Sequence, residues 1–184
     1  ARAGPWKLFT KEKLSSFDDL KGMKIRAPEI EGVIAGLKQV GAKPTVIPFN
    51  ELYGALQQGV VDGMATLGNL MISQKFYEVT NYCYQNDWGI GLDKQMINVN
   101  AWDGMSKEQQ SILVDTFNEL EPQDFFRATA DAESTNFAKW REINGADSTP
   151  MLDASAAQRT LKPAIKDLTD DIFGAGTYDK IQSA

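Results

Sequence analysis

The sequence predicts an α/β fold in which parallel strands are covered by helices. Short β-branched or apolar runs alternate with helical spacing at short intervals, and glycine or proline stands at the junctions. This alternation is clearest over residues 23–66. The expected strands cover 23–27, 45–47 and 60–66, and the expected helices cover 29–40 and 51–58.

The first expected strand runs from Met23 to Ala27 and ends at Pro28, because proline has no backbone N–H to donate to a sheet. The following helix, over 29–40, carries apolar residues at helical spacing, and Gly41 ends it. Those apolar residues are Ile30, Val33, Ile34, Leu37 and Val40.

The second expected strand, over 45–47, is closed by Pro48. Asn50 is expected to be the N-cap of the helix over 51–58, since its side chain can accept from the first free backbone N–H groups. Gly59 fits the C-terminal stop of that helix.

The segments on either side of these units are less regular. Residues 1–15 are expected to form an irregular or extended approach, and Ser16 to cap a one-turn helix that Gly22 ends. Residues 68–77 are expected to be helical. The run over 79–99 predicts one long strand, or two collinear strands with a bend at the glycines.

The last third of the chain is expected to be mostly helical. Ser106 opens a capping box and a helix, which Pro122 should break or kink. A second helix is expected over 123–143, followed by a short strand over 148–152. Ser155 is then expected to cap a last long helix.

The composition excludes several classes of function. With 19 basic and 25 acidic residues the formal charge is −6, which argues against nucleic acid as a main partner. No basic run favours an anionic membrane surface, and no apolar run is long enough to insert across a bilayer. The sequence has no histidine, the commonest general base and a usual zinc ligand. Cys83, the single cysteine, is expected to be a buried, inert thiol. Because the Gly89-x-Gly91 pair lacks the third glycine of a dinucleotide site, no cofactor is expected.

Arg26 is the first candidate for a binding residue. It lies where a strand leads into a helix, and open α/β sheets hold ligands at such strand ends. A guanidinium offers a fixed fork of donors that matches a carboxylate or phosphate. The alternative from these residues alone is a surface arginine that closes a local ion pair.

Five segments resemble the extracytoplasmic solute-binding subunits of TRAP transporters, in the same order and spacing. They are Asp19-Leu20-Lys21-Gly22-Met23-Lys24-Ile25-Arg26-Ala27-Pro28, Leu37-Lys38-Gln39-Val40-Gly41-Ala42, the run from Pro48 to Gly63, Lys75-Phe76-Tyr77-Glu78-Val79, and Ala101-Trp102. The resemblance covers residues 16 to about 115 well and the tail more loosely.

The resemblance implies a periplasmic, two-lobed α/β receptor that closes on a small organic acid and hands it to a membrane permease. Arg26 occupies the position of the family's arginine that pairs with the substrate carboxylate. Pro28 and Phe49 match positions that line the cleft, and Phe49 would pack on the carbon skeleton of the ligand or serve only as a core aromatic. We expect a monomer and no enzymatic activity.

The sequence departs from the family pattern at Thr66 and at the pair Asp87-Trp88. Thr66 stands where an asparagine or tryptophan usually meets the ligand, and the variant linked to a metal-assisted 2-oxo acid site is absent, so no metal is expected. Asp87 and Trp88 replace an asparagine–histidine pair, which favours a hydroxylated or cationic monocarboxylate over a plain dicarboxylate. Asn69 is a further possible donor to the ligand, or only a helix cap.

Family members carry a long segment before this region, so the chain is expected to be the C-terminal part of the receptor. Residues 1–88 and 140–184 would form the second lobe, and 89–139 a hinge-crossing strand and helices that brace the first lobe. Two other classes stay open, a cytoplasmic ligand-sensing domain of a regulator and an enzyme. A pure interaction module is the remaining alternative.

Overall fold

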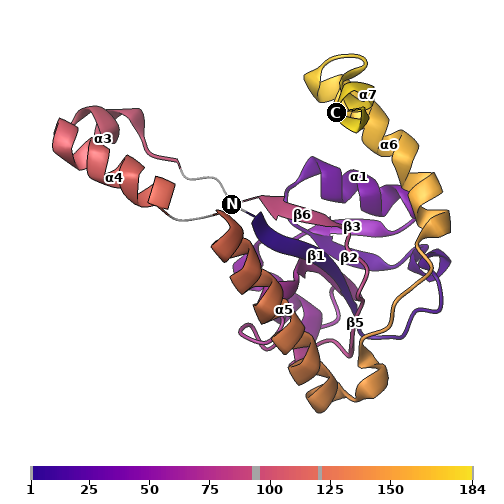
Figure 1. Cartoon of the computed structure of the whole chain (residues 1–184). Coiled ribbons are helices and arrows are strands. Elements are labelled where there is room, and N and C mark those ends of the chain that lie inside the picture. Colours follow the sequence, from indigo (N-terminus) through magenta and orange to yellow (C-terminus); the bar gives the residue numbers. More distant parts are fainter. Residues whose placement is uncertain (1, 93–95, 120–121, 184) are drawn as a thin grey trace.

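The computed structural model describes residues 2–92, 96–119 and 122–183 of the chain. Within them, six strands form one mixed sheet in the order β3-β2-β4-β1-β5, and β6 also pairs with β1 (Figure 1). The strands are β1 (Arg2–Thr10), β2 (Lys24–Ala27), β3 (Lys43–Val46), β4 (Gly63–Leu67), β5 (Tyr82–Cys83) and β6 (Gly89–Leu92). The predicted α/β class is therefore confirmed.

Helices and one-turn 3₁₀ helices connect and cover these strands. The helices are α1 (Glu31–Gln39), α2 (Leu52–Gln57), α3 (Val99–Asp103), α4 (Lys107–Glu119), α5 (Pro122–Asn144), α6 (Ser155–Phe173) and α7 (Thr177–Gln182). The 3₁₀ helices are η1 (Phe17–Leu20), η2 (Phe49–Glu51), η3 (Gly68–Leu70), η4 (Phe76–Glu78) and η5 (Ala146–Ser148).

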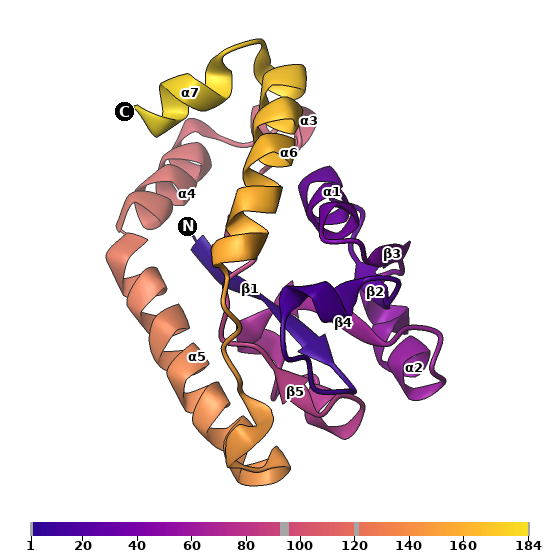
Figure 2. The ribbon, with the colours of Figure 1, turned by 90° about the vertical axis from the view of Figure 1, so that its right-hand side faces the viewer.

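Two hydrophobic clusters lie on opposite faces of the sheet. The first packs Phe9 and Met64 against Phe137 and Trp140 of α5, together with the two leucines of α2. The second joins the strands to α1 and α6, and its members include Leu8, Ile25, Leu37, Tyr84 and Leu161. Since successive strand residues point to opposite faces, Leu8 and Phe9 belong to different clusters. Figure 2 shows α5 and α6 separated by the sheet.

Residues 2–10 form the interior strand β1, so for them the extended alternative is confirmed and the irregular one is wrong. β1 pairs antiparallel with β4 on one side and with β5 and β6 on the other. The parallel unit that the sequence predicts, β2 between β3 and β4, is present beside it. A strand that pairs only with distant partners gives no local alternation of elements, which is why the sequence pattern did not identify it.

Over its described residues from 79 to 92, this segment forms two short strands along the same side of β1, as in the second of the two predicted alternatives. β5 pairs with Phe9 and Thr10, whereas β6 pairs with the stretch from Arg2 to Trp6. The break lies at residues 84–88, where Tyr84 is buried, and not at the glycines.

Several local expectations were wrong. The segment over 68–77 contains the single turns η3 and η4 and no α-helix, and residues 149–152 form no strand. Asn50 does not cap α2, because the 3₁₀ turn η2 precedes that helix and Glu51 is its N-cap. Ser155 does not cap α6; instead its backbone N–H donates to Asp153 Oδ1 over 2.9 Å.

Other predicted caps are confirmed. Ser16 forms a reciprocal capping box with Asp19 at η1. At α4, the backbone N–H of Gln109 donates to Ser106 Oγ, and that of Ser106 donates to Gln109 Oε1. Pro122 is the first residue of α5, a position where proline loses no hydrogen bond.

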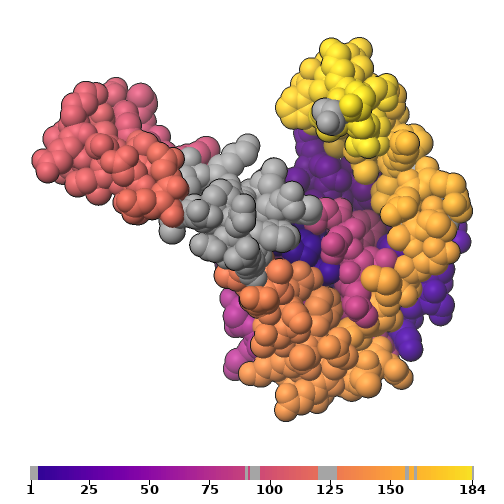
Figure 3. All heavy atoms as spheres, in the orientation of Figure 1, coloured from indigo at the N-terminus to yellow at the C-terminus, as the bar shows by residue number. Residues whose placement is uncertain are grey.

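Helices α3 and α4 project away from the sheet and from α6 and α7 (Figures 1 and 3). Within α4 the buried side chain is Gln110, whose amide nitrogen donates to the Trp102 carbonyl of α3 over 2.7 Å. Apolar side chains of α4 are instead exposed, with Ile112 at 57% and Phe117 at 46%. The pair therefore carries an apolar surface that the described residues do not cover.

The close pairing of β1 and β4 at Gly63 gives a test of the fold. A Cβ at Gly63 would lie 2.3 Å from the Phe9 carbonyl oxygen, so Gly63→Ala forces the two strands apart. We expect this substitution to lower the free energy of unfolding by about 1–3 kcal/mol in urea denaturation. Gly54→Ala in α2 is the control, because nothing lies within 4 Å of its new Cβ. An equal loss of stability in both variants would contradict the strand register.

Candidate functional site

The carboxyl ends of β2, β3 and β4 meet at one edge of the sheet. β2 pairs in parallel with both neighbours, and Arg26 lies beside Thr45 of β3 and Met64 of β4. Since residues paired in this register point to the same face, Arg26 lies on the face of the first cluster, which contains Met64 and Ile47. This is the kind of edge at which an open α/β sheet binds a ligand.

Arg26 is a buried cation held by backbone carbonyls. It is 3% exposed, its Nε donates to the Ile47 carbonyl over 2.9 Å, and its Nη1 donates to the Ala65 carbonyl over 3.4 Å. Burial lowers the pKa of its guanidinium. Among the described residues no carboxylate pairs with Arg26. A buried charge without a counter-ion is costly, so the arrangement favours an anion from outside this segment.

Three other predicted site residues lie on the same edge. Pro28 follows Arg26 by two positions and is half-buried. Phe49, in η2 just after β3, is 43% exposed, and its ring meets that of Phe76 edge-on at 6.3 Å. Thr66 is 2% exposed and lies two positions beyond Met64 in β4, so it points to the same face as Arg26.

Asn69 lies within the one-turn helix η3, directly after β4. The helix-cap alternative for Asn69 was wrong, because Leu67 occupies the N-cap position of that turn. The backbone carbonyl of Asn69 accepts a hydrogen bond from Asn136 Nδ2 of α5 over 3.0 Å. The turn that follows Thr66 is therefore attached to α5.

Asp87 and Trp88 lie in the segment between β5 and β6 and not at the carboxyl ends of β2, β3 and β4. Asp87 is 59% exposed at its side chain and accepts from Lys7 Nζ at 2.5 Å. Trp88 packs on the second cluster, on the face opposite to Arg26, where its ring meets Phe17 edge-on at 5.7 Å. The structure thus does not bring Trp88 together with Arg26, and it gives the charge of Asp87 a cationic partner.

Lys7 is the buried cation that the sequence argument missed. Its side chain is 5% exposed, and Nζ lies 2.5 Å from Asp87 Oδ1, 2.8 Å from Glu133 Oε1 and 2.8 Å from the Gln85 carbonyl. The ring of Phe137 lies 5.2 Å from the same ammonium. Burial alone would lower the pKa of Lys7, but the hydrogen bonds and charges of Asp87 and Glu133 together raise it.

Two sequence signals point to this cluster once the strand is known. In β1, Lys7 and Phe9 are two positions apart, so both point to the face that α5 covers. In α5, Glu133 precedes Phe137 by four positions and Trp140 by seven, which places it on the buried stripe. A lysine and a glutamate on facing buried stripes indicate an ion pair.

The cysteine and the possible metal ligands of the described residues form no second candidate site. Cys83 is buried, as predicted, and burial raises the pKa of its thiol well above the usual range. Over residues 2–92, 96–119 and 122–183, no cluster of three or more histidine, cysteine, aspartate or glutamate side chains is arranged to hold a metal ion. The helices in those ranges include none with the length and apolar character needed to span a membrane.

This arrangement, an α/β sheet with a buried arginine at the carboxyl ends of its parallel strands, suits the binding of an anion. The family model of bacterial extracellular solute-binding proteins, family 7 (DctP), matches residues 3–171. The chain belongs to this family. The predicted resemblance and fold class are thereby confirmed.

Among curated relatives, the C4-dicarboxylate-binding periplasmic protein of Vibrio cholerae is 30% identical over 146 residues, which cover 79% of this chain and 40% of that protein. The monocarboxylate 2-oxoacid-binding periplasmic protein of a Nostoc species is also 30% identical, over 83% of this chain and 38% of its own length. The chain thus spans about two fifths of these relatives.

Solved structures agree with the sequence relatives. A TRAP periplasmic solute-binding protein from Desulfovibrio salexigens, solved with bound orotic acid, superposes with a TM-score of 0.87 at 27% identity. The match covers 98% of this chain and 58% of that one. A second, from Fusobacterium nucleatum with bound sn-glycerol-3-phosphate, has a TM-score of 0.84 at 25% identity over 98% of this chain and 57% of its own.

A stability measurement can test whether Arg26 is a structural or a binding residue. Because its charge is buried and no carboxylate of the described chain pairs with it, Arg26→Met is expected to leave the unfolding free energy unchanged or raise it by about 0.5–2 kcal/mol. Arg141→Met is the control, since Arg141 Nη1 donates to Thr149 Oγ1 over 3.2 Å. A loss for Arg26→Met larger than the control's would identify Arg26 as structural.

The raised pKa of Lys7 makes the free energy of unfolding depend on pH. In the folded chain the pKa of Lys7 lies above its usual value of 10.5, so its stabilising contribution is complete below that pH and is lost as the pH rises through the raised value. We expect Lys7→Met to cost about 1–3 kcal/mol at pH 7, because it leaves Glu133 without its cation. In urea denaturation, the difference between wild type and variant should shrink in strong alkali. A difference that grows with alkali would refute the assignment.

Proposed function

We propose that this protein is the periplasmic receptor of a bacterial TRAP-type transporter, binding a small organic acid and delivering it to the membrane permease. The observation that carries the proposal is Arg26, a buried guanidinium at the carboxyl edge of parallel strands with no carboxylate partner among the described residues. A ligand carboxylate would supply the missing counter-ion through charge-assisted hydrogen bonds. We propose binding without chemical conversion, so the protein is not an enzyme.

The neighbouring residues would contact the rest of the ligand. Phe49 offers an exposed ring face beside Phe76, which suits the carbon skeleton of the acid. Thr66 has a hydroxyl that makes no hydrogen bond to another described residue, so it can bind a ligand hydroxyl. Pro28 would shape the wall beside Arg26, and Asn69 would add a polar contact. We do not include Asp87 or Trp88 in the direct contacts.

The charges favour a ligand with one anionic group on this side. Arg26 is the cation without a counter-ion in this part of the described chain, whereas Lys7 is already bound by the two carboxylates of Asp87 and Glu133. A second carboxylate on the ligand would thus find no free cation here and would meet excess negative charge near Lys7. We infer a hydroxylated monocarboxylate as the ligand class.

The chain would form most of one lobe of a two-lobed receptor. We propose that residues 1–88 and 140–184 belong to this lobe, and that 89–139, including the projecting helices α3 and α4, contributes to the other. The exposed apolar residues of α4 support this division, because an apolar helix face is normally covered. Contacts from both lobes to one ligand would favour the closed form, which the permease would recognise.

The test is a thermal-shift screen of the full-length protein with D-erythronate, succinate and orotate. D-erythronate and succinate have the same number of carbon atoms but differ in the second carboxylate, so they form a matched pair. We expect a shift with the hydroxylated monocarboxylate and little with succinate; saturation at 100 times the dissociation constant adds about 2.7 kcal/mol.

The same screen with Arg26→Ala should show no shift, since a desolvated charged contact contributes about 2–5 kcal/mol to binding. Arg141→Ala serves as the control and should respond like the wild type. Equal shifts in the wild type and Arg26→Ala would remove Arg26 from the site. A larger response to succinate than to D-erythronate would overturn the ligand class but not the receptor.

A further inference from the structure

The turn after Thr66 rests directly on the buried ion pair of Lys7. Thr66 of β4 is the register partner of Lys7 in β1, so both side chains lie on the same sheet face. A Cβ at Gly68 would lie 2.9 Å from Lys7 Cγ and 3.7 Å from Glu133 Oε1. The turn therefore lies so close to Lys7 and Glu133 that a side chain at Gly68 would meet both.

The same turn is held from α5 by a second contact. Asn136 lies three positions after Glu133, one helical turn further along the same side of α5. Its Nδ2 donates to the Asn69 carbonyl over 3.0 Å. Helix α5 thus bonds this segment directly through Asn136, and it reaches the segment indirectly through Glu133 and its partner Lys7.

Among the described residues, Arg26 has no hydrogen bond or ion pair to α5. Its guanidinium is bound by the carbonyls of Ile47 and Ala65, both of which belong to the sheet or its immediate continuation. The two halves of the candidate site are therefore supported by different means. The cation depends on the sheet, and the polar turn beside it depends on α5.

We propose that Lys7, Glu133 and Asn136 are positioning residues, which fix the Thr66–Asn69 turn in the geometry needed to bind the ligand. The inference rests on the proposed function and adds α5 to the determinants of ligand selectivity. A displacement of α5 along β1 would move this turn while leaving Arg26 in place. The position of α5 would thus change the recognition of the ligand's polar groups and not of its carboxylate.

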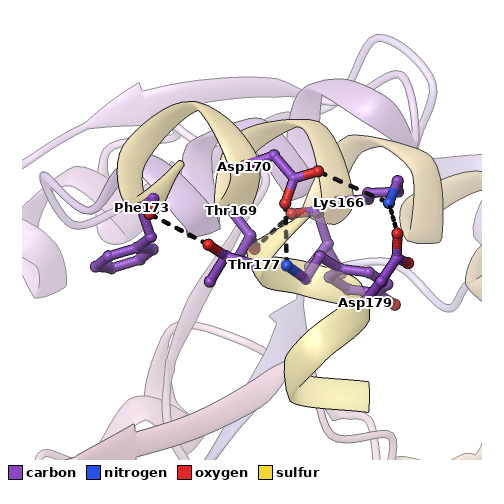
Figure 4. A network of polar contacts seen from close by, with 8 residues as sticks. Lys166, Thr169, Asp170, Phe173, Thr177 and Asp179 are labelled. Atoms are coloured by element: carbon purple, nitrogen blue, oxygen red, sulfur yellow. Dashed lines mark hydrogen bonds and ion pairs between the residues drawn. The ribbon is translucent and has the colours of Figure 1, made fainter. Parts of the chain in front are cut away.

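The chain contains a matched control for the charge cluster. Lys166 also binds two carboxylates, Asp170 and Asp179, and lies 5.7 Å from the ring of Tyr178 (Figure 4). This network joins α6 to α7, where the Asp170 carboxylate also accepts from the Tyr178 backbone N–H over 3.0 Å. Lys166→Met removes the same kinds of contact from a more exposed position, in α6 and not in the Thr66–Asn69 turn.

Hydrogen exchange of the full-length, ligand-free protein tests the proposal without a known ligand. We expect Lys7→Met and Asn136→Ala each to speed exchange over residues 64–72 by about tenfold more than over residues 24–40. Lys166→Met should leave both segments unchanged. A general loss of stability would instead speed exchange in both segments alike, and that outcome would overturn the positioning role.

Binding gives the second readout. In the thermal-shift screen, Asn136→Ala is expected to reduce the affinity for D-erythronate by about tenfold while reducing that for acetate, which offers only a carboxylate, by less than about twofold. Equal losses for both acids would contradict the proposal. If neither acid shifts the wild type while exchange over 64–72 still responds, the receptor assignment fails and the positioning of the turn stands.

Discussion

The site depends on a positive charge that has been taken out of water without a counter-ion. Arg26 could be placed there because two carbonyls, at Ile47 and Ala65, point their oxygens at its guanidinium. Those carbonyls lie on either side of β2, so the parallel register of β3, β2 and β4 fixes them. The sheet thus compensates the charge only in part, and the remainder is available to an anion.

A second buried cation, only two strands away, has the opposite character. Lys7 is saturated by Asp87, Glu133 and the Gln85 carbonyl, and these contacts join β1, the 84–88 segment and α5. Lys7 therefore joins parts of the protein, whereas Arg26 keeps a charge that no carboxylate of the described residues neutralises. The distinction follows from the number of carboxylates around each, and not from burial, which is similar for both.

The sequence was sufficient to predict the parallel unit and the position of Arg26 near the end of its strand. Both depend on a local pattern, in which strand, turn and helix follow each other in order. It failed for β1, whose partners lie far along the chain, and for that reason it also failed for Lys7. Short turns such as η3 and η4 were misread as a helix, since apolar spacing over ten residues does not separate one turn from three. Asp87 was expected to face the ligand in the cleft, and only the fold could identify Lys7 as its partner.

The central place of β1 has a consequence for how the sheet is made. Its neighbours are β4, β5 and β6, so Trp6 meets Leu67 on one side and Gly89 on the other. Every one of these pairings closes a long loop, and such contacts form late because their entropy cost comes before their reward. The units β2–α1–β3 and α2–β4 can assemble from neighbouring residues, whereas β1 must wait with both of its edges open. Each side of β1 thus needs a partner from far along the chain.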